Sequence, residues 1–222
     1  MFPVNFAINH KRWNTKRLNV PDMQAALRPP VSIYTEQSPN PNSMKFVLNR
    51  ELVPDGLSFD YAEPSEGLKE GKNSPLAISL FGIDGVRRVF IAGNFVTLTK
   101  EEDIDWGEIM FEVKVFLKDY FEADKPVFIK RTMEMNSTIV ESDSETVQQI
   151  KAALDQYVRP AVESDGGAIN FHAFDEATGT VKVLLQGSCS GCPSSTLTLK
   201  AGIENLLTRL VPGVKTVEAE GV

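Results

Sequence analysis

The sequence predicts an α+β fold of two small α/β-layer domains joined by a linker. Short apolar runs bounded by Pro, Gly and Asn fill much of residues 31–99, and a long amphipathic pattern follows them. A second series of patterns, in the order α-β-β-α-β, occupies residues 142–222. A chain of 222 residues, 42% of them hydrophobic, is long enough to bury two small cores. We therefore expect an N-terminal domain at 31–129, a linker at 130–141 and a C-terminal domain at 142–222.

The first 30 residues differ from the rest of the chain in charge. They hold five basic residues and one acid, Asp22, whereas the whole chain has a net charge of −7. Because they show no clear amphipathic helix, we expect residues 1–30 to be a disordered extension in a bacterial cytoplasmic protein. A basic N-terminus with few acids is also typical of organellar targeting segments, so a mitochondrial protein is the alternative.

The strands expected in the N-terminal domain are short and rich in β-branched and aromatic residues. They cover residues 31–36, 44–48, 57–61, 88–92 and 95–99. Gly93-Asn94 lies between the last two and is typical of a two-residue hairpin turn. Residues 63–73 are charged and contain glycine, which predicts an exposed loop.

Two helices are expected in the same domain. Ser74 followed by Pro75 predicts an N-cap and a short helix over residues 76–81. From Asp105 to Tyr120, apolar residues recur every three or four positions, which predicts a longer helix with one face packed against the sheet. The domain contains no Cys and no His, and we find no catalytic constellation in it.

The C-terminal domain begins with a helix. Ser142-x-x-Glu145 fits a capping box at its start, and Pro160 followed by Asp165-Gly166-Gly167 predicts its end. Two strands, a helix that begins at Pro193 and a last short strand complete the domain. The strands are expected at residues 168–174, 180–186 and 214–219.

The only two cysteines, Cys189 and Cys192, lie between a predicted strand and a predicted helix. The unpaired backbone N–H groups at a helix start favour thiolates over thiols. No acid lies between Glu176 and Glu204, so nothing charged nearby in the sequence opposes that ionisation. Gly and Ser residues surround the pair, and we expect an exposed loop without apolar neighbours. These thiols are candidates for soft-metal ligation or redox chemistry.

Several chemistries are compatible with one C-x-x-C pair. A thiol–disulfide oxidoreductase would cycle Cys189 and Cys192 between dithiol and disulfide, although such motifs normally open a longer βαβ unit. A zinc site wants four ligands, and beyond the thiols the chain offers only His10 and His172. An iron–sulfur cluster also wants about four thiolates, which two chains related by a two-fold axis would supply. A pair of buried, inert cysteines is the remaining alternative.

Composition excludes some classes of function. A chain with a pI near 5.0 is a poor binder of nucleic acid phosphates. No run approaches the roughly 18 consecutive apolar residues of a membrane helix. Two cysteines are too few for a secreted disulfide scaffold, which favours a reducing compartment.

Three further motifs combine with the cysteine pair into a family resemblance. Tyr157-Val-Arg-Pro160, Asp165-Gly-Gly167 and the run Gly187–Ser195 together resemble the NifU-like C-terminal domain. The run Tyr34–Phe46 resembles the signature of the N-terminal domain of Nfu proteins. The resemblance covers almost everything after residue 30.

The resemblance implies a non-enzymatic iron–sulfur cluster scaffold or carrier. Such proteins assemble a cluster or receive it from an upstream donor or cysteine desulfurase system, and transfer it to apo-proteins. It further implies a homodimer that holds a [4Fe–4S] cluster, with [2Fe–2S] possible, between Cys189 and Cys192 of each chain. The N-terminal domain would then serve partner contact or regulation of transfer.

Overall fold

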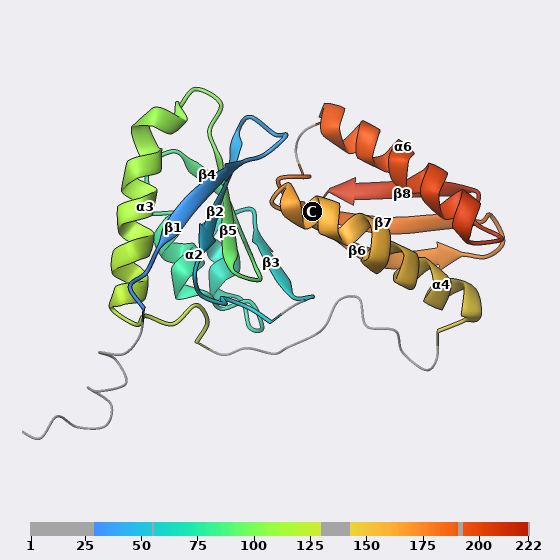
Figure 1. Ribbon diagram of the computed structural model, residues 1–222, viewed down its shortest axis with the longest axis horizontal. Helices are drawn as coiled ribbons and strands as arrows, with labels where there is room; N and C mark the ends of the chain where they lie inside the picture. The colour runs from blue at the N-terminus through green and yellow to red at the C-terminus, as the bar shows by residue number, and fades with distance from the viewer. Residues whose placement is uncertain (1–28, 55, 130–142, 191–192, 222) are drawn as a thin grey trace, which may run out of the picture. The chain divides into compact units, whose positions relative to one another are not determined.

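The computed structural model describes residues 29–54, 56–129, 143–190 and 193–221, and describes side chains of the last range only from residue 197 onward. Val31–Val222 form one compact unit. The predicted linker at 130–141 and all but the last two residues of the predicted extension at 1–30 lie outside the described residues, and the predicted domain division stays a prediction. The unit contains two sheets and mixed helices, which confirms the α+β fold class (Figure 1).

The N-terminal sheet has five antiparallel strands in the order β1-β2-β5-β4-β3. They are β1 (Ile33–Gln37), β2 (Ser43–Leu48), β3 (Ser58–Tyr61), β4 (Val86–Ala92) and β5 (Phe95–Lys100). Ala92 pairs with Phe95, so Gly93-Asn94 forms the predicted two-residue hairpin turn. Each strand lies within two residues of its predicted bounds, because the alternation that predicts a strand also decides which face packs on the core.

Helices α2 (Pro75–Leu80) and α3 (Trp106–Glu122) accompany this sheet. Ser74 caps α2 as predicted: its Oγ accepts the N–H of Ala77 at 3.1 Å and donates to the carbonyl oxygen of Val127 at 2.7 Å. In α3, Val113 and Leu117 are completely buried, in agreement with the predicted apolar face. A short 3-10 helix, η1 (Pro64–Leu68), lies inside the stretch predicted as loop.

The C-terminal sheet has the order β6-β7-β8, with β6 antiparallel and β8 parallel to β7. Its elements are α4 (Glu145–Ala153), the π-helical turn η2 (Leu154–Val158), α5 (Arg159–Ser164), β6 (Gly167–Asp175), β7 (Thr180–Gly187), α6 (Pro193–Leu210) and β8 (Thr216–Gly221). α4, η2 and α5 follow one another without a break and together correspond to the first predicted helix. The predicted order α-β-β-α-β is therefore confirmed.

Two details of the first C-terminal helix differ from the prediction. Pro160 does not end it, because the wider π turn η2 comes directly before α5 and Pro160 lies in the first turn of α5. The helix ends at Ser164, directly before the predicted Asp165-Gly166-Gly167. The observed N-cap is Ser144, whose Oγ accepts the N–H of Val147 at 3.4 Å. Ser142, the predicted cap, lies outside the described residues.

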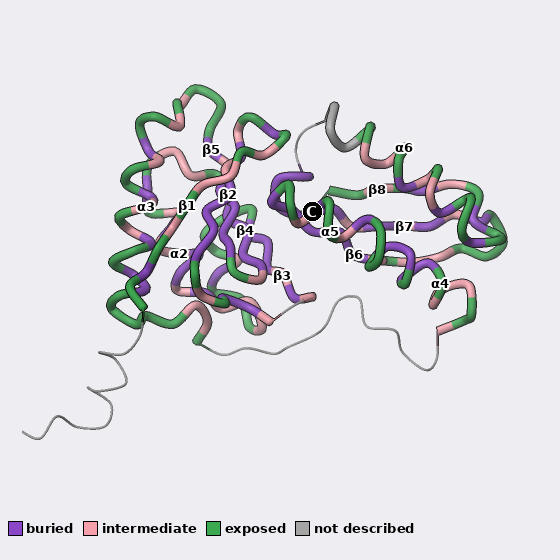
Figure 2. Tube along the Cα trace, viewed as in Figure 1, coloured by how far each residue is buried: buried purple, intermediate pink, exposed green. Residues whose placement is uncertain are grey.

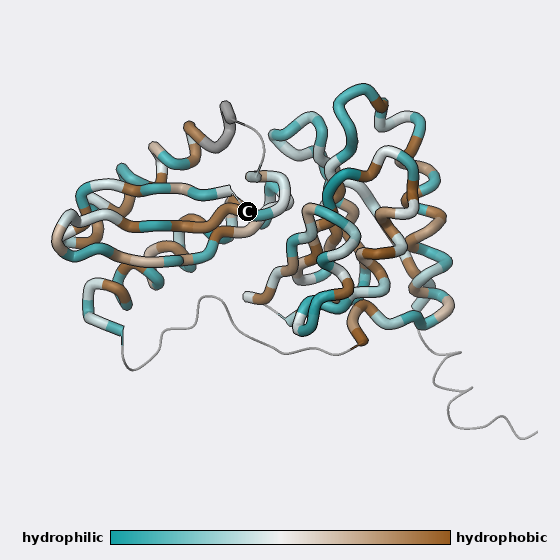
Figure 3. The backbone as a smooth tube through the Cα atoms, turned by 180° about the vertical axis from the view of Figure 1, so that it is seen from behind, coloured by the Kyte–Doolittle hydropathy of each residue, from teal (hydrophilic) through white to brown (hydrophobic). Residues whose placement is uncertain are grey.

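Each sheet has its own hydrophobic core, and a third, smaller cluster contains residues of both sheets. Figure 2 shows buried residues concentrated along the strands, and Figure 3 shows that hydrophobic residues recur there. The smaller cluster consists of Val47, Phe90, Ala92, Phe95 and Ala168. In the described part of the chain, no helix is long and apolar enough to cross a membrane.

Candidate functional site

We use the term cysteine loop for Gly187–Ser190, the described residues that follow β7. Gly187 has a φ of +66°, and a Cβ atom there would lie 2.8 Å from both the Gly166 carbonyl oxygen and the Phe90 ring. Only glycine fits this position, because both the backbone angle and the space exclude a side chain. The N–H and the hydroxyl of Ser190 both donate to the Gly187 carbonyl oxygen, at 3.1 and 3.2 Å, which tightens the turn.

Cys189 is buried, contrary to the expectation of an exposed loop without apolar neighbours. Its exposed fraction is 9%, and it belongs to the core cluster of the C-terminal sheet. The residue lines a cavity of about 60 Å³ together with Pro39, Asp165, Ser188 and Leu199. Ser188 lies beside the thiol in space as well as in the sequence, but apolar residues of distant elements also surround it and bury it.

The predicted preference of Cys189 for the thiolate is also wrong in this conformation. Burial raises the pKa of Cys189 from its ordinary value of 9.0 to about 11, although a hydrogen bond with the Ser188 hydroxyl opposes the change. The Asp165 carboxylate raises it further. Asp165 precedes the stretch between Glu176 and Glu204 that contains no acid in the sequence. The turn before β6 nevertheless brings Asp165 near the cysteine loop in space. The buried thiol is therefore protonated at neutral pH.

This pKa predicts slow alkylation of Cys189 in the metal-free protein. At pH 8 the thiolate fraction is about 100-fold lower than for a thiol of ordinary pKa, and the rate should rise with pH up to about 11. Because the folded state holds the proton more tightly, the stability that the thiol contributes is present below about pH 9 and is lost as the pH rises towards 11. Alkylation followed by fragment-ion mass spectrometry separates Cys189 from Cys192, with guanidinium-unfolded protein as control. Equal rates in folded and unfolded protein at pH 8 would contradict the prediction.

The other predicted ligands do not join Cys189 in the described residues. Cys192 and His10 lie outside them, and His172 is exposed on β6. No group of three or more His, Cys, Asp or Glu residues that could hold a metal ion occurs in the described ranges.

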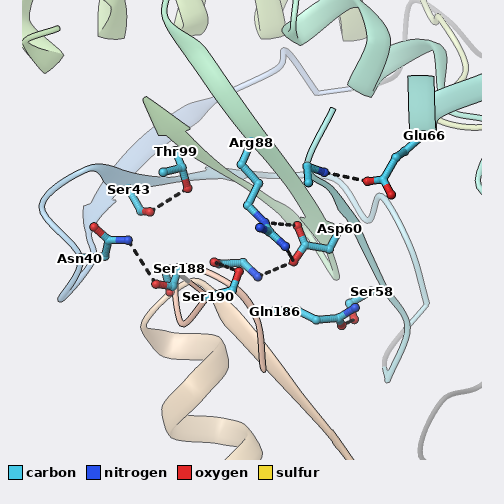
Figure 4. A network of polar contacts seen from close by, with 12 residues as sticks. Asn40, Ser43, Ser58, Asp60, Glu66, Arg88, Thr99, Gln186, Ser188 and Ser190 are labelled. Atoms are coloured by element: carbon cyan, nitrogen blue, oxygen red, sulfur yellow. Dashed lines mark hydrogen bonds and ion pairs between the residues drawn. The ribbon is translucent and has the colours of Figure 1, made fainter. Parts of the chain in front are cut away.

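A buried carboxylate of β3 binds the cysteine loop, and sequence patterns did not single it out. Asp60 Oδ2 accepts the N–H of Gly187 at 2.8 Å (Figure 4). Arg88 of β4 donates twice to the same carboxylate, at 2.7 and 3.0 Å. The Asp60 side chain has no exposed surface, and burial raises its pKa above the ordinary value while Arg88 and the Gly187 N–H oppose that shift.

Further polar contacts join the N-terminal sheet and its loops to the C-terminal elements. The Ser58 hydroxyl donates to Gln186 Oε1 at 2.9 Å, and Asn40 Nδ2 donates to the Ser188 carbonyl oxygen at 3.4 Å (Figure 4). Lys45 Nζ donates to the Ser164 carbonyl oxygen at 3.3 Å. With Asp60, these contacts surround the loop that carries Cys189.

The fold and the loop together define a class: a two-sheet α+β protein that presents a C-x-x-C thiol at a strand-to-helix turn. Two family models match the chain and identify its family. The model described as "Scaffold protein Nfu/NifU N terminal" matches residues 33–124, and the NifU-like domain matches residues 150–218. The chain belongs to the Nfu family of NifU-like proteins.

Two relatives identified by sequence agree with this assignment. The chain is 39% identical over 225 residues to "NifU-like protein 5, mitochondrial" of Arabidopsis thaliana, covering 99% of this chain and 80% of that protein. It is 42% identical over 186 residues to "NFU1 iron-sulfur cluster scaffold homolog, mitochondrial" of Drosophila willistoni, covering 84% of this chain and 62% of that protein. A solution NMR structure of a NifU-like protein from Saccharomyces cerevisiae is 23% identical, with a TM-score of 0.41, over 56% of this chain and 100% of that chain.

Proposed function

We propose that this protein is an iron–sulfur cluster scaffold and carrier, and not an enzyme. The observation that carries the proposal is the position of Cys189 at the turn between β7 and α6, inside the segment that matches the NifU-like domain. The names of the relatives support the same cargo. The cluster, [4Fe–4S] or alternatively [2Fe–2S], would be held between two subunits by Cys189 and Cys192 of each chain.

Transfer follows from the small number of ligands that each chain supplies. Two thiolates per subunit hold the cargo only while two subunits stay together, whereas a recipient apo-protein with its own thiolates holds it within one chain. Ligand exchange then runs towards the recipient, and dissociation of the dimer releases the carrier. Upstream, a cluster donor or a cysteine desulfurase system would supply iron and sulfide.

In the described conformation, the environment of Cys189 disfavours attack by this thiol on a disulfide, the step that a thiol–disulfide oxidoreductase needs. Attack on a disulfide requires a thiolate, and burial raises the pKa of Cys189 to about 11. Cluster binding also requires deprotonation, but the metal itself stabilises the thiolate and displaces the proton. A high pKa in the metal-free state is therefore compatible with a scaffold.

The names of the relatives favour a mitochondrial protein over the expected bacterial cytoplasmic one. We propose the mitochondrial matrix, a compartment that contains cluster recipients and keeps thiols reduced. Expression of the full chain with a C-terminal tag in a eukaryotic cell, followed by fractionation, tests this. Tag in the cytosol alone would contradict import directed by the residues of this sequence.

Anaerobic reconstitution with iron and sulfide tests the cluster proposal. We expect a coloured dimer whose cluster content per chain rises with protein concentration, because the cluster and the dimer form together by mass action. Size-exclusion chromatography with absorption detection measures both quantities in one run. A coloured species that elutes as a monomer at every concentration would contradict the shared site, and a colourless, iron-free protein would contradict the function.

A further inference from the structure

One face of the C-terminal sheet is buried without belonging to the core of that sheet. Side chains alternate across a strand, and Ile169 and Leu185 point into the C-terminal core. Their neighbours Ala168, Asn170 and Gln186 lie on the opposite face, yet only 2%, 4% and 8% of each is exposed. A sheet standing alone would leave this face in water.

Residues of the N-terminal sheet cover that face. Ala168 packs in the small cluster with Val47, Phe90 and Phe95. Beside this apolar contact, Gln186 Oε1 accepts the Ser58 hydroxyl. The covered face is therefore a docking interface with an apolar centre and polar edges.

The docking surface contacts Gly187 of the cysteine loop with one carboxylate and one aromatic ring. Asp60 is completely buried, held by two hydrogen bonds from Arg88, and its carboxylate accepts the N–H of Gly187. The Phe90 ring comes so close to Gly187 that a Cβ atom would lie 2.8 Å from it. A buried carboxylate has few reasons to face a backbone N–H other than to hold that segment.

Docking covers the thiol. Pro39 of the β1–β2 loop lines the cavity at Cys189, and its neighbour Asn40 donates to the Ser188 carbonyl oxygen. The cavity of about 60 Å³ has room for about five water molecules. Loading a four-iron cluster beside Cys189 would therefore require this cavity to widen.

Docking also occupies a donor that a cluster would use. Backbone N–H groups that donate to cluster sulfur stabilise bound iron–sulfur clusters. In the docked state the Gly187 N–H is engaged by Asp60. A cluster that uses this donor would therefore have to displace the Asp60 carboxylate.

Docking carries a cost at one buried hydroxyl. Thr97 Oγ1 is buried and has no hydrogen-bond partner among the described residues. It lies 2.8 Å from the position of a Cβ on Gly166, at the contact between β5 and the turn before β6. Undocking would return this hydroxyl to water and recover the penalty.

We propose that the N-terminal sheet and the β1–β2 loop form a docking surface for this chain's own cysteine loop, in competition with the cluster and a second copy. This inference rests on the proposed function and assigns the N-terminal part a role in it. The docked state holds the metal-free thiol out of reach, and loading requires withdrawal of Pro39 and Asp60. The apparent cluster affinity is then the affinity of the undocked state multiplied by the undocked fraction.

The test is Ala168→Glu in the full chain, with Ala177→Glu in the exposed β6–β7 turn as matched control. A glutamate at position 168 is buried against Phe90 and Phe95 when docked and solvated when undocked, so it raises the undocked fraction. We expect alkylation of Cys189 in the metal-free protein to become about tenfold faster, or more. At limiting iron we expect higher cluster occupancy per chain than in wild type, and the control should match wild type in both.

The two measurements separate this inference from the proposed function. Unchanged alkylation in an Ala168→Glu protein with wild-type circular dichroism would overturn the docking of the loop. Faster alkylation of Cys189 with unchanged cluster occupancy per chain would overturn the competition between docking and cluster binding. Cluster loading by the wild type would still support the scaffold function in that case. If neither wild type nor Ala168→Glu binds a cluster, both the proposed scaffold function and the competition are overturned. Ser58→Ala is a second variant, expected to change both readouts in the same direction but less, should Ala168→Glu not fold.

Discussion

Replacing Cys189 with serine is expected to abolish cluster loading and the cluster-dependent dimer. Serine offers a hard hydroxyl in place of a soft thiolate, and a shared site would lose one ligand from each subunit. Removing a group that merely positions a metal ligand typically weakens binding by roughly 10–100-fold, and removing the ligand itself should cost more. Iron and sulfide content per chain after anaerobic reconstitution measures the loss.

The matched control for this variant is Ser190→Ala in the same loop. It removes a hydroxyl that donates to the Gly187 carbonyl oxygen and leaves both thiols in place. We expect this control to load a cluster and form the dimer. A Cys189→Ser protein with full iron content and dimeric elution would exclude Cys189 as a ligand.

Replacing Asp60 with alanine is expected to give the largest loss of stability among single changes at the interface. Arg88 would keep a positive charge that is only 17% exposed and has lost its carboxylate, and the Gly187 N–H would lose its acceptor. Breaking a buried ion pair from one side typically costs about 3–5 kcal/mol, because the remaining charge is buried without compensation. Urea denaturation of the metal-free full chain measures the change in the free energy of unfolding.

The control for Asp60→Ala is Asp103→Ala, which removes an exposed carboxylate. A surface change of this kind is expected to alter the free energy of unfolding by less than about 0.5 kcal/mol. Equal small losses in both variants would show that the Asp60–Arg88 pair contributes no more than a surface pair. The double variant Asp60→Ala, Arg88→Met should recover part of the loss, since it removes the uncompensated charge.

Local chemistry in the sequence determined the elements of this protein. Alternation predicted each strand within two residues, Gly93-Asn94 predicted the β4–β5 turn, and Ser74 before Pro75 predicted the cap of α2. These signals work because each depends on neighbours within a few positions. Pro160 misled the prediction of a helix end, because a π turn before it depends on packing that local patterns do not record.

The sequence also placed the cysteine pair at a strand-to-helix turn, but not the surroundings of Cys189. Asp60 alternates with Phe59 and Tyr61, so a lone sheet would expose it, and the Gly and Ser residues near Cys189 predict an open loop. Tertiary structure reverses both predictions. Asn40 contacts Ser188 across 148 positions of the chain, Asp60 accepts the Gly187 N–H across 127, and these contacts bury the thiol. Burial and pKa depend on which surfaces meet, and that is decided only when distant segments pack together.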